Sequence, residues 1–458
     1  MFERELQRKI EDFRELGIPS YLPRDSKLHM VDRMVSTVIG ARRSGKSFRV
    51  LQAADELIRQ GFLPSLRHVC PVDFDNPILS AMTAKDLPLI QGTFLKITPE
   101  CGLQTPLLFV LDEIHRIPKW EDYVIELSRN PRWKVIVTGS SSKLLKDDIS
   151  TSLRGKSISS TVYPLSFAEY LRFTACEGQS ASTRGQAAMR ARFDDYLKWG
   201  GYPAIPGAPA PSREVLLREY FDTMLLKDIV QRFNVSKPQQ CIELYHYLLS
   251  NIGRPYTLKS AYELLKQAGH ATSRDAVREY VAWAEDAWLL FTIPIHAQSQ
   301  KEQERNYRKV YAIDWALALR NSSVWDGSYA RSLENMVYLH LRRNYPRVRY
   351  YLTRSKRQEV DFLVSDERGK PVLAVQVSQE ISHPDTLRRE LEPLVSTARY
   401  FGTAQNLILT LGQEQRFDQD GVTVHALPTW RWLLQENAVA CSGSDLASCP
   451  PASAPVAG

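Results

Sequence analysis

The sequence predicts an α/β protein built on a parallel β-sheet, and three apolar runs support this fold class. The run at 35–39 is rich in β-branched residues, ends at Gly40, and is followed from Gly45 by apolar residues at helical spacing. The run at 107–111 is apolar throughout, as expected of a strand buried on both faces of a parallel sheet. The run at 133–139 has the same character. Strands that alternate with helical segments favour a parallel sheet with helices on its faces.

The composition indicates a globular protein with several domains. The chain has 458 residues, of which 43% are hydrophobic and 24% charged, enough for about two to four domains. No apolar run approaches the roughly 18 residues of a membrane span, and residues 1–16 form a charged amphipathic pattern unlike a signal peptide. We therefore expect a cytoplasmic protein without a membrane partner. The six cysteines stand singly, which argues against a zinc site or a disulfide framework.

The segment GARRSGKS, residues 40–47, fits the phosphate-loop pattern G-x-x-x-x-G-K-[ST]. Its two glycines let the backbone turn with its N–H groups facing an anion, and the following helix N-terminus attracts negative charge. We expect Lys46 to reach the β- and γ-phosphates of ATP and the Ser47 hydroxyl to bind Mg²⁺. The predicted nucleotide-binding residues are Gly40, Arg42, Arg43, Ser44, Gly45, Lys46, Ser47 and Phe48.

The run at 107–111 ends in two acids that suit phosphoryl transfer. We expect Asp112 to hold Mg²⁺ through water, and Glu113 to orient or deprotonate the attacking water. At the end of the 133–139 run, Ser140 is the predicted nucleotide sensor, with Thr138 as the alternative. Arg154 is either an arginine finger for a neighbouring subunit's γ-phosphate or an exposed structural arginine. Together with Lys46, the residues Glu113, Ser140 and Arg154 form the predicted catalytic set.

The acid pair also opens the tetrapeptide DEIH, residues 112–115, which fits the DExH box of superfamily 2 helicases. Such helicases carry a second parallel-sheet domain, whereas residues 164–234 show a helical pattern with no second alternation of strands and helices after it. We therefore favour a single ATPase core with a helical lid.

Changes in pattern along the chain predict its domain organisation. The lid is interrupted by Gly200, Gly201 and Pro203, and three amphipathic helices then precede two strand-like runs, 289–296 and 309–313, around a charged loop. Three helices and a hairpin predict a winged helix. The predicted segments are an N-terminal helix and connector at 1–30, the ATPase core at 31–165, the lid at 166–235, the winged helix at 236–314, a smaller α/β domain at 325–436, and a disordered tail at 437–458.

The smaller α/β domain has the pattern of a restriction-endonuclease-like fold, with a helix, a hairpin containing EVDF, and a strand VLAVQVS. Active enzymes of this fold use two carboxylates for a metal and a lysine for water. Asp361 fits the first acid and Glu334 is placed to assist. Gln376 and Ser378, however, stand where the second acid and the lysine are needed. We therefore expect a catalytically degenerate centre, with an ATP-gated nuclease as the lesser alternative.

The charge distribution favours an anionic partner. The net charge is +7, and residues 340–357 contain seven Lys or Arg, no acid and three tyrosines. We expect DNA contacts, while a solvated basic strand and a winged helix that docks a protein or stabilises the lid remain alternatives. The candidate DNA-binding residues are Arg274, Arg278, Lys301, Arg305, Arg347, Arg349, Arg354 and Lys356.

The motifs GARRSGKS, LLFVLDEIHRIPKWED, VTGSSSKLL, SLRGK, PLSFAEYL, GGYP, EVDF and QVS together resemble a family of bacterial and archaeal AAA+-type P-loop ATPases. In that family a winged helix and a restriction-endonuclease-like domain of unknown function follow the motor. The resemblance implies Mg²⁺-dependent ATP hydrolysis and a homo-oligomer, with a hexameric ring as one form. We therefore expect an ATPase coupled to DNA remodelling or translocation, with a nucleotide-controlled switch for a protein partner as the alternative.

Overall fold

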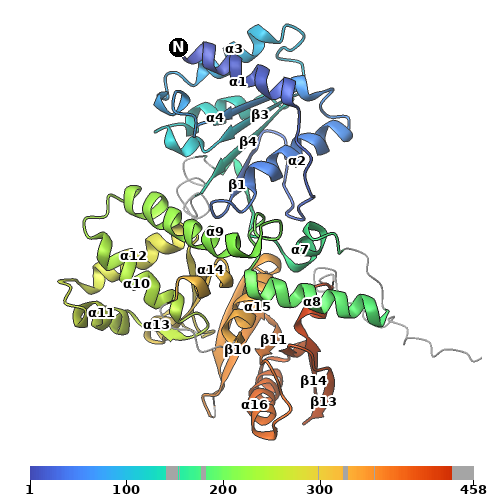
Figure 1. Cartoon of the computed structure of the whole chain (residues 1–458), viewed down its shortest axis with the longest axis vertical. Helices are drawn as coiled ribbons and strands as arrows, with labels where there is room; N and C mark the ends of the chain where they lie inside the picture. Colours follow the sequence, from blue (N-terminus) through green and yellow to red (C-terminus); the bar gives the residue numbers. More distant parts are fainter. Residues whose placement is uncertain are drawn as a thin grey trace, which may run out of the picture.

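The structure is a computed structural model that describes residues 1–140, 153, 155–176, 182–297, 299–322, 329–354 and 356–435. Figure 1 shows an N-terminal sheet domain at one end of the molecule and helices around a second sheet at the other. Within the described ranges, no helix combines the length and apolar character needed to cross a membrane. The predicted arginine finger Arg154 and the predicted tail at 437–458 lie outside the described residues.

The N-terminal domain is a five-stranded parallel sheet in the order β2-β3-β4-β1-β5. Its strands are β1 (Val35–Ile39), β2 (Val69–Asp73), β3 (Leu107–Asp112), β4 (Trp133–Gly139) and β5 (Ser157–Thr161). Helices α1 (Phe2–Leu16), α3 (Pro88–Ile97) and α4 (Glu121–Ser128) cover one face, and α2 (Lys46–Arg59) covers the other. The predicted parallel sheet is confirmed, and its apolar runs are buried on both faces because helices cover both.

A helical block follows the sheet and leads into a mixed module. The block comprises α7 (Phe167–Phe173), α8 (Thr183–Trp199), α9 (Ala210–Thr223) and the π-helix η4 (Met224–Gln231). The helices of the module are α10 (Pro238–Ser250), α11 (Leu258–Gln267), α12 (Arg274–Asp286), α13 (Gln300–Arg305) and α14 (Trp315–Arg320). Its strands β6 (Pro255–Tyr256), β7 (Leu290–Ile293) and β8 (Arg308–Ala312) pair in the antiparallel order β6-β8-β7.

The segment between β7 and β8 differs from the predicted charged loop because it contains the short helix α13. Ser299 caps this helix by accepting a hydrogen bond from the Glu302 backbone N–H at 3.2 Å. The sequence QKEQER consists of good helix formers. The hairpin pattern on either side predicts a loop here, in conflict with this local preference. Lys301 and Arg305, predicted on a wing loop, are therefore helical residues, and the Arg305 side chain lies outside the described part.

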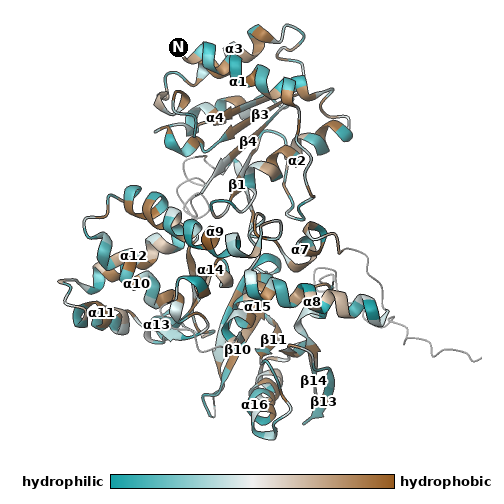
Figure 2. Ribbon diagram, viewed as in Figure 1, coloured by the Kyte–Doolittle hydropathy of each residue, from teal (hydrophilic) through white to brown (hydrophobic). Residues whose placement is uncertain are grey.

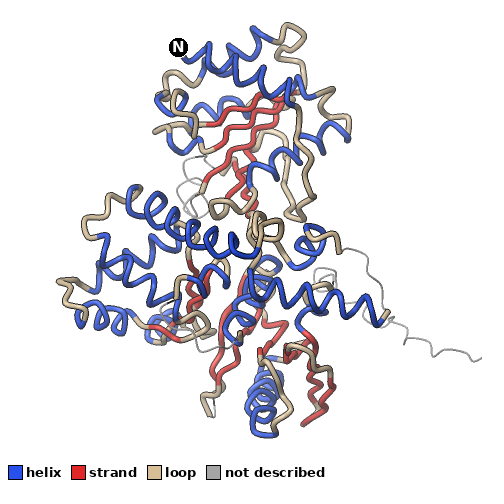
Figure 3. Tube along the Cα trace, viewed as in Figure 1, coloured by secondary structure: helices blue, strands red, loops and turns tan. Residues whose placement is uncertain are grey.

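The C-terminal domain is a six-stranded mixed sheet in the order β13-β14-β12-β11-β10-β9. Its strands are β9 (Arg347–Leu352), β10 (Glu359–Ser365), β11 (Pro371–Val377), β12 (Gln405–Thr410), β13 (Gln415–Gln419) and β14 (Val422–Pro428). Helices α15 (Ala330–Asn344), α16 (Pro384–Phe401) and α17 (Thr429–Trp432) accompany them. Figure 3 shows this second sheet separated from the first by the helical block.

The helical block, the mixed module and the C-terminal domain share one continuous hydrophobic core. Buried residues from Phe167 in α7 to Leu433 after α17 belong to it, and Figure 2 shows stretches of apolar residues along many of these elements. Trp315, at the start of α14, is buried and donates its indole N–H to the Leu197 carbonyl in α8 at 2.9 Å. These three segments therefore pack as one body beneath the parallel sheet.

A buried carboxylate joins the helical block to α14. Asp314 is fully buried and accepts hydrogen bonds from the backbone N–H groups of Gly201 at 2.7 Å, Ala316 at 2.9 Å and Leu317 at 3.0 Å. Burial raises the pKa of Asp314 to about 6. Gly200 has φ of +78°, and a Cβ at this position would collide with the Asp314 carboxylate. The glycine pair therefore makes room for a carboxylate that fixes the end of α8.

Replacing Gly200 by alanine should lower the free energy of unfolding by about 2 to 4 kcal/mol, because the new Cβ meets the Asp314 carboxylate in a strained backbone conformation. Urea unfolding of the full chain measures the change. Gly207→Ala is the matched control, since Gly207 has open space around its Cβ position. Equal stability of the two variants would contradict this account of the Gly200 turn.

Candidate functional site

The phosphate-loop segment connects β1 to α2 at the carboxyl edge of the parallel sheet. Gly40 has φ of +148°, and a Cβ there would collide with the Val162 carbonyl just after β5. Glycine is therefore required where the loop passes the end of β5. Gly45 lies at the N-cap, and α2 begins at Lys46, so the loop runs directly into a helix N-terminus.

The Lys46 ammonium is folded back onto this loop. Its Nζ donates hydrogen bonds to the carbonyl oxygens of Gly40 and Ala41, both at 3.1 Å. Lys46 is 7% exposed, and burial lowers its pKa. Because its hydrogen-bond acceptors are neutral carbonyls, this buried positive charge lacks an anion in direct contact within the described residues. A phosphate group in the loop would supply one.

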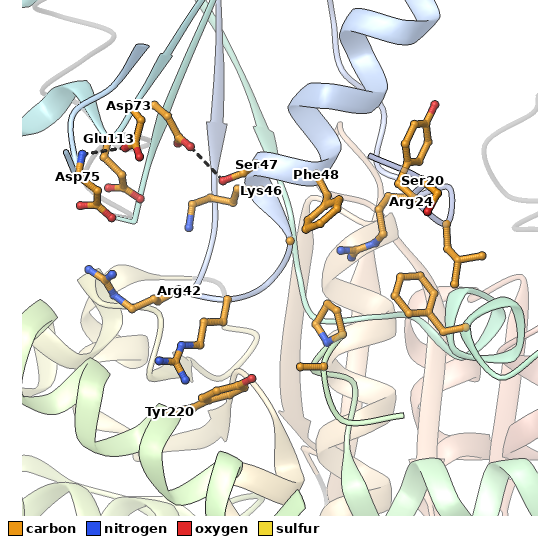
Figure 4. Close-up of a pocket in the computed structure, with 18 residues that line it drawn as sticks. Ser20, Arg24, Arg42, Lys46, Ser47, Phe48, Asp73, Asp75, Glu113 and Tyr220 are labelled. Carbon is orange, nitrogen blue, oxygen red and sulfur yellow. Dashed lines mark hydrogen bonds between the residues drawn. The ribbon is translucent and has the colours of Figure 1, made fainter. Parts of the chain in front are cut away.

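The loop meets the acid pair at the tip of β3. The Ser47 hydroxyl donates to Asp112 Oδ2 at 3.0 Å, and the Thr138 hydroxyl donates to Asp112 Oδ1. The backbone N–H of Glu113 donates to Thr138 Oγ1 at 3.1 Å. Thr138, the alternative sensor, therefore fixes both acids, whereas Ser140 is buried at the end of β4 and does not line the cavity. Figure 4 shows the bond from Ser47 across to the acid of β3.

Glu113 lies in a strained backbone conformation with φ of +54°. Burial raises its pKa, although the nearby Lys46 charge opposes the shift. His115 Nδ1 lies 3.3 Å from Glu113 Oε2, but burial, reinforced by Arg232, lowers the His115 pKa to about 3. The imidazole is therefore neutral at neutral pH and does not neutralise the carboxylate. A carboxylate that holds its proton more tightly is a stronger base than an ordinary glutamate.

These residues line a cavity of about 900 Å³. One side is polar and carries Lys46, Ser47, Asp112 and Glu113. The rest of the lining includes apolar and aromatic residues, namely Tyr21, Leu22, Phe48, Phe173, Pro203 and Tyr220. Figure 4 shows Phe48 and Tyr220 on opposite sides of the loop. This arrangement offers a charged end for phosphates and an apolar end for a nucleotide base.

Sequence analysis missed most of the apolar wall and two acids, Asp73 and Asp75, that also line the cavity. Asp73 ends β2 in register with Asp112, so the acid at the end of a strand was a usable signal. Burial raises the Asp73 pKa. The wall residues that were missed come from the connector, from α7, from the segment before α9 and from α9 itself. No local pattern links them, because only the fold brings these segments together.

Two arginines of the loop contact the helical block. Arg42 forms a bidentate pair with Asp228 of η4, with Nε 3.1 Å from Oδ2 and Nη2 2.9 Å from Oδ1. Asp228 is 5% exposed, and its hydrogen bond raises the Arg42 pKa. The Arg43 guanidinium lies 4.4 Å from the centre of the Tyr220 ring in α9. The conformation of the loop is therefore linked to that of the helices.

The connector fixes the loop from the opposite side through Arg24, which is 6% exposed. Its guanidinium donates to the Ser44 carbonyl at 2.7 Å, to the Tyr163 carbonyl at 2.6 Å and to Glu169 Oε1 at 2.8 Å. Glu169 also completes the capping box of α7 with Ser166. One buried side chain thus joins the phosphate loop, the end of β5 and the first helix of the block.

The candidate DNA-binding residues are spread over α12, α13 and the region around β9, and most have partners within the chain. Arg278 pairs with Asp275 at 2.8 Å, and Lys356 pairs with Glu392 at 3.2 Å. Arg354 lies over the Tyr400 ring and Arg274 over the Tyr262 ring, at 4.4 and 5.9 Å from the ring centres. For Arg349, burial lowers the pKa, while Arg347 is exposed near Gly369. The structure does not bring these residues into one cluster.

The acids of the C-terminal domain surround a lysine from the neighbouring module. Lys309 of β8 is 1% exposed, and its Nζ lies 2.6 Å from Glu334, 3.0 Å from Glu359 and 3.1 Å from Asp361. The Gln376 amide accepts from the Asp361 N–H at 2.7 Å. The predicted acids Asp361 and Glu334 thus come together around an ammonium group.

Gln376 and Ser378 bring uncharged side chains to this part of the domain. Gln376 Nε2 donates to Glu390 at 2.8 Å, and the Ser378 hydroxyl donates to the Glu380 carbonyl at 2.9 Å. Neither residue can replace the second acid or the lysine of a hydrolytic centre. The buried Lys309 ammonium already fills the position between the acids.

Comparison with known families divides the chain in three. Residues 32–171 match the AAA domain, residues 190–324 a domain of unknown function (DUF8612), and residues 329–431 a second domain of unknown function (DUF4143). An uncharacterized protein of Methanocaldococcus jannaschii is 26% identical over 424 residues, covering 90% of each chain. An uncharacterized protein of Haemophilus influenzae is 26% identical over 401 residues, covering 88% of this chain and 94% of that one.

Among solved structures, a Walker-type ATPase of Pyrococcus abyssi is similar, with 14% identity and a TM-score of 0.42, over 69% of this chain and 94% of that chain. The match at residues 32–171 covers the phosphate loop, the acid pair and all five strands of the parallel sheet. Residues 32–171 are therefore similar to an AAA domain and contain the phosphate loop and the acid pair.

Proposed function

We propose that the protein is a Mg²⁺-dependent ATPase. The observation that carries this proposal is the hydrogen bond of 3.0 Å between the Ser47 hydroxyl and Asp112, which joins the phosphate loop to the acid pair beside Glu113. A serine that opens the helix after a phosphate loop and an acid at the tip of a neighbouring strand are the two groups that hold Mg²⁺ in P-loop enzymes.

The residues present fit a magnesium nucleotide. The buried Lys46 ammonium has only neutral acceptors, so it favours a phosphate. Ser47 and Asp112 offer the hard oxygen ligands that Mg²⁺ prefers. The apolar and aromatic lining residues, Phe48 among them, offer a surface for the base. When bound, Mg²⁺ supplies positive charge that stabilises the phosphate oxygens.

Glu113 is the general base in this proposal. Thr138 holds its backbone N–H, and burial makes the carboxylate a stronger proton acceptor. Glu113 would take a proton from the attacking water while Lys46 stabilises the charge that develops on the transferred group. Ser140 and Arg154 stay candidates for sensor and arginine finger.

A second candidate is a nucleotide-controlled switch that binds a protein partner. It is favoured by the Arg42 pair with Asp228 and the Arg43 contact with Tyr220, because these tie the phosphate loop to the helical block. Tightly retained nucleotide with slow turnover would distinguish the switch from the hydrolase. Glu113 favours the hydrolase, since a protein that only holds ATP has no need of a strong base.

We further propose that hydrolysis is coupled to remodelling or translocation on DNA by a homo-oligomer. The net charge of +7 and the arginines of α12 and β9 support DNA contact. The three helices and the β6-β8-β7 sheet suit a winged helix, and the C-terminal domain suits a restriction-endonuclease-like fold with a degenerate centre.

Lys46→Ala should weaken binding of ATP by about tenfold or more, because it removes the buried charge that faces the phosphates. Glu113→Gln should keep ATP binding and lower turnover by about 100-fold or more, because the amide cannot accept the proton. Calorimetry and phosphate release measure the two effects. Glu126→Gln, on the exposed side of α4, is the control and should match the parent. Normal turnover of Glu113→Gln would show that another group is the base.

The rate should depend on pH through Glu113. Burial raises its pKa above the ordinary value of 4.5, and the ionised form is the active one, so activity should be lost on acidification at a higher pH than for an exposed glutamate. The pH profile of kcat/KM tests this. An acidic limb centred at or below 4.5, at a pH where circular dichroism shows the fold intact, would refute the assignment.

For the DNA proposal, fluorescence anisotropy with single-stranded, duplex and branched DNA should show binding that weakens as salt rises. Arg274→Glu combined with Lys301→Glu should reduce affinity about tenfold, whereas Lys85→Glu on the ATPase core should change it little. An ATPase rate indifferent to all three DNA forms, together with no salt-dependent binding, would remove DNA coupling and leave the ATPase proposal standing.

A further inference from the structure

A second cavity, of about 840 Å³, lies between the parallel-sheet domain and the C-terminal domain. Its walls come from the connector at 24–29, the edge strand β5, helix α7, the end of α15 and residues 433–435. Arg24 borders this cavity and the nucleotide cavity alike. The two cavities therefore share one buried residue of their walls.

The second cavity carries excess positive charge. Of its five cationic side chains, Arg24 is paired with Glu169 and Arg172 with Asp25. Lys27, Arg342 and Arg343 have no carboxylate partner among the described residues. Arg343 donates to the Pro164 carbonyl, and Arg342 lies 4.4 Å from the centre of the Phe291 ring and 3.3 Å from the Tyr338 hydroxyl. Three positive charges therefore face a cavity whose only two acids are already paired.

Several polar atoms in the cavity wall also lack partners. Ser160 is 7% exposed and His340 8% exposed, and neither Ser160 Oγ nor His340 Nε2 has a hydrogen-bond partner in the described structure. The same holds for Ser26 Oγ and Arg342 Nε. Buried polar groups are nearly always satisfied, and all four of these unsatisfied atoms belong to residues that line the cavity. Burial lowers the His340 pKa to about 3, so this side chain contributes a neutral ring.

The chemistry of the wall identifies the class of occupant. The residues that line the cavity include Ser26, Ser159, Ser160 and Thr161, which carry hydroxyl groups, together with Arg342 and Arg343. Guanidinium groups and hydroxyls are the donors that proteins use for phosphate oxygens, and arginine matches a phosphate with two parallel hydrogen bonds. A carboxylate ligand would use fewer of these donors.

We propose that this second cavity binds a ligand that carries phosphate groups. The site is a binding site only and does not depend on ATP hydrolysis. Its occupant is either a small phosphate compound or a stretch of nucleic-acid backbone, which present the same oxygens to the wall. Because Arg24 also holds the Ser44 carbonyl of the phosphate loop, a ligand here lies one side chain away from the nucleotide.

The test uses the full chain with its nucleotide cavity saturated by a non-hydrolysable ATP analogue. Calorimetry with pyrophosphate and anisotropy with a short oligothymidylate measure the two sources separately. Lys27→Glu should weaken the binding of whichever probe occupies the cavity by about tenfold. Lys27 is exposed and has no described partner, so this variant should fold normally, and its unfolding midpoint is checked.

Lys96→Glu on α3 makes the same charge change away from the cavity and should leave affinity unaltered. If either probe binds, and only Lys27→Glu weakens that binding, the site is supported. The probe that binds then shows whether the occupant is a small phosphate compound or a nucleic-acid backbone. Absence of binding by both probes, or equal weakening by both variants, overturns it. If the chain does not bind ATP, but Lys27→Glu still weakens the binding of a probe and Lys96→Glu does not, the ATPase proposal fails and this one stands.

Discussion

The contact between Ser47 and Asp112 is the constraint on which the nucleotide site depends. It exists because β1 and β3 are parallel and flank β4, so the ends of all three strands meet at one edge of the sheet. Thr138, at the end of β4, then fixes both acids. The sheet must be covered on both faces to hold this edge, and α2 does so while also presenting Lys46 and Ser47 at its first turn.

The phosphate loop is held by side chains from outside the parallel sheet. Arg24 holds the Ser44 carbonyl and Glu169, and Arg42 holds Asp228, with each carboxylate at most 5% exposed. Removing one partner from such a buried pair leaves an uncompensated charge, so the loop and the helical block are constrained to move together. Arg24 extends the same constraint to the second cavity. The conformation of the phosphate loop is thus physically linked to two other parts of the molecule.

The sequence was sufficient for the parts of the site whose signals are local. The glycines, Lys46 and Ser47 fall in one short segment, and Asp112 and Glu113 end one apolar strand. The ties that hold these groups were not predictable, since Arg24 and Glu169 are 145 residues apart and Arg42 and Asp228 are 186 apart. Thr138 lies in the last part of β4 and Ser140 directly follows it, and both residue types suit a strand end. The sequence does not show which of the two side chains faces Asp112. Helix α13 was missed because a hairpin pattern on either side outweighed its local preference.

Lys309 gives the acid cluster of the C-terminal domain a structural role. Three carboxylates around one ammonium would carry excess negative charge, but burial raises the Glu334 pKa to about 7 and also raises that of Asp361, so part of the charge is neutralised by protons. The neighbouring carboxylates, Glu334 first, raise the Lys309 pKa against the effect of burial. Tyr311 donates its hydroxyl to Glu334 Oε1 at 2.8 Å, the same oxygen that pairs with Lys309, and Tyr307 donates its hydroxyl to Glu359 Oε2 at 2.9 Å. A lysine held this firmly joins β8 to β10 and α15, and the acids thereby connect the mixed module to the C-terminal domain.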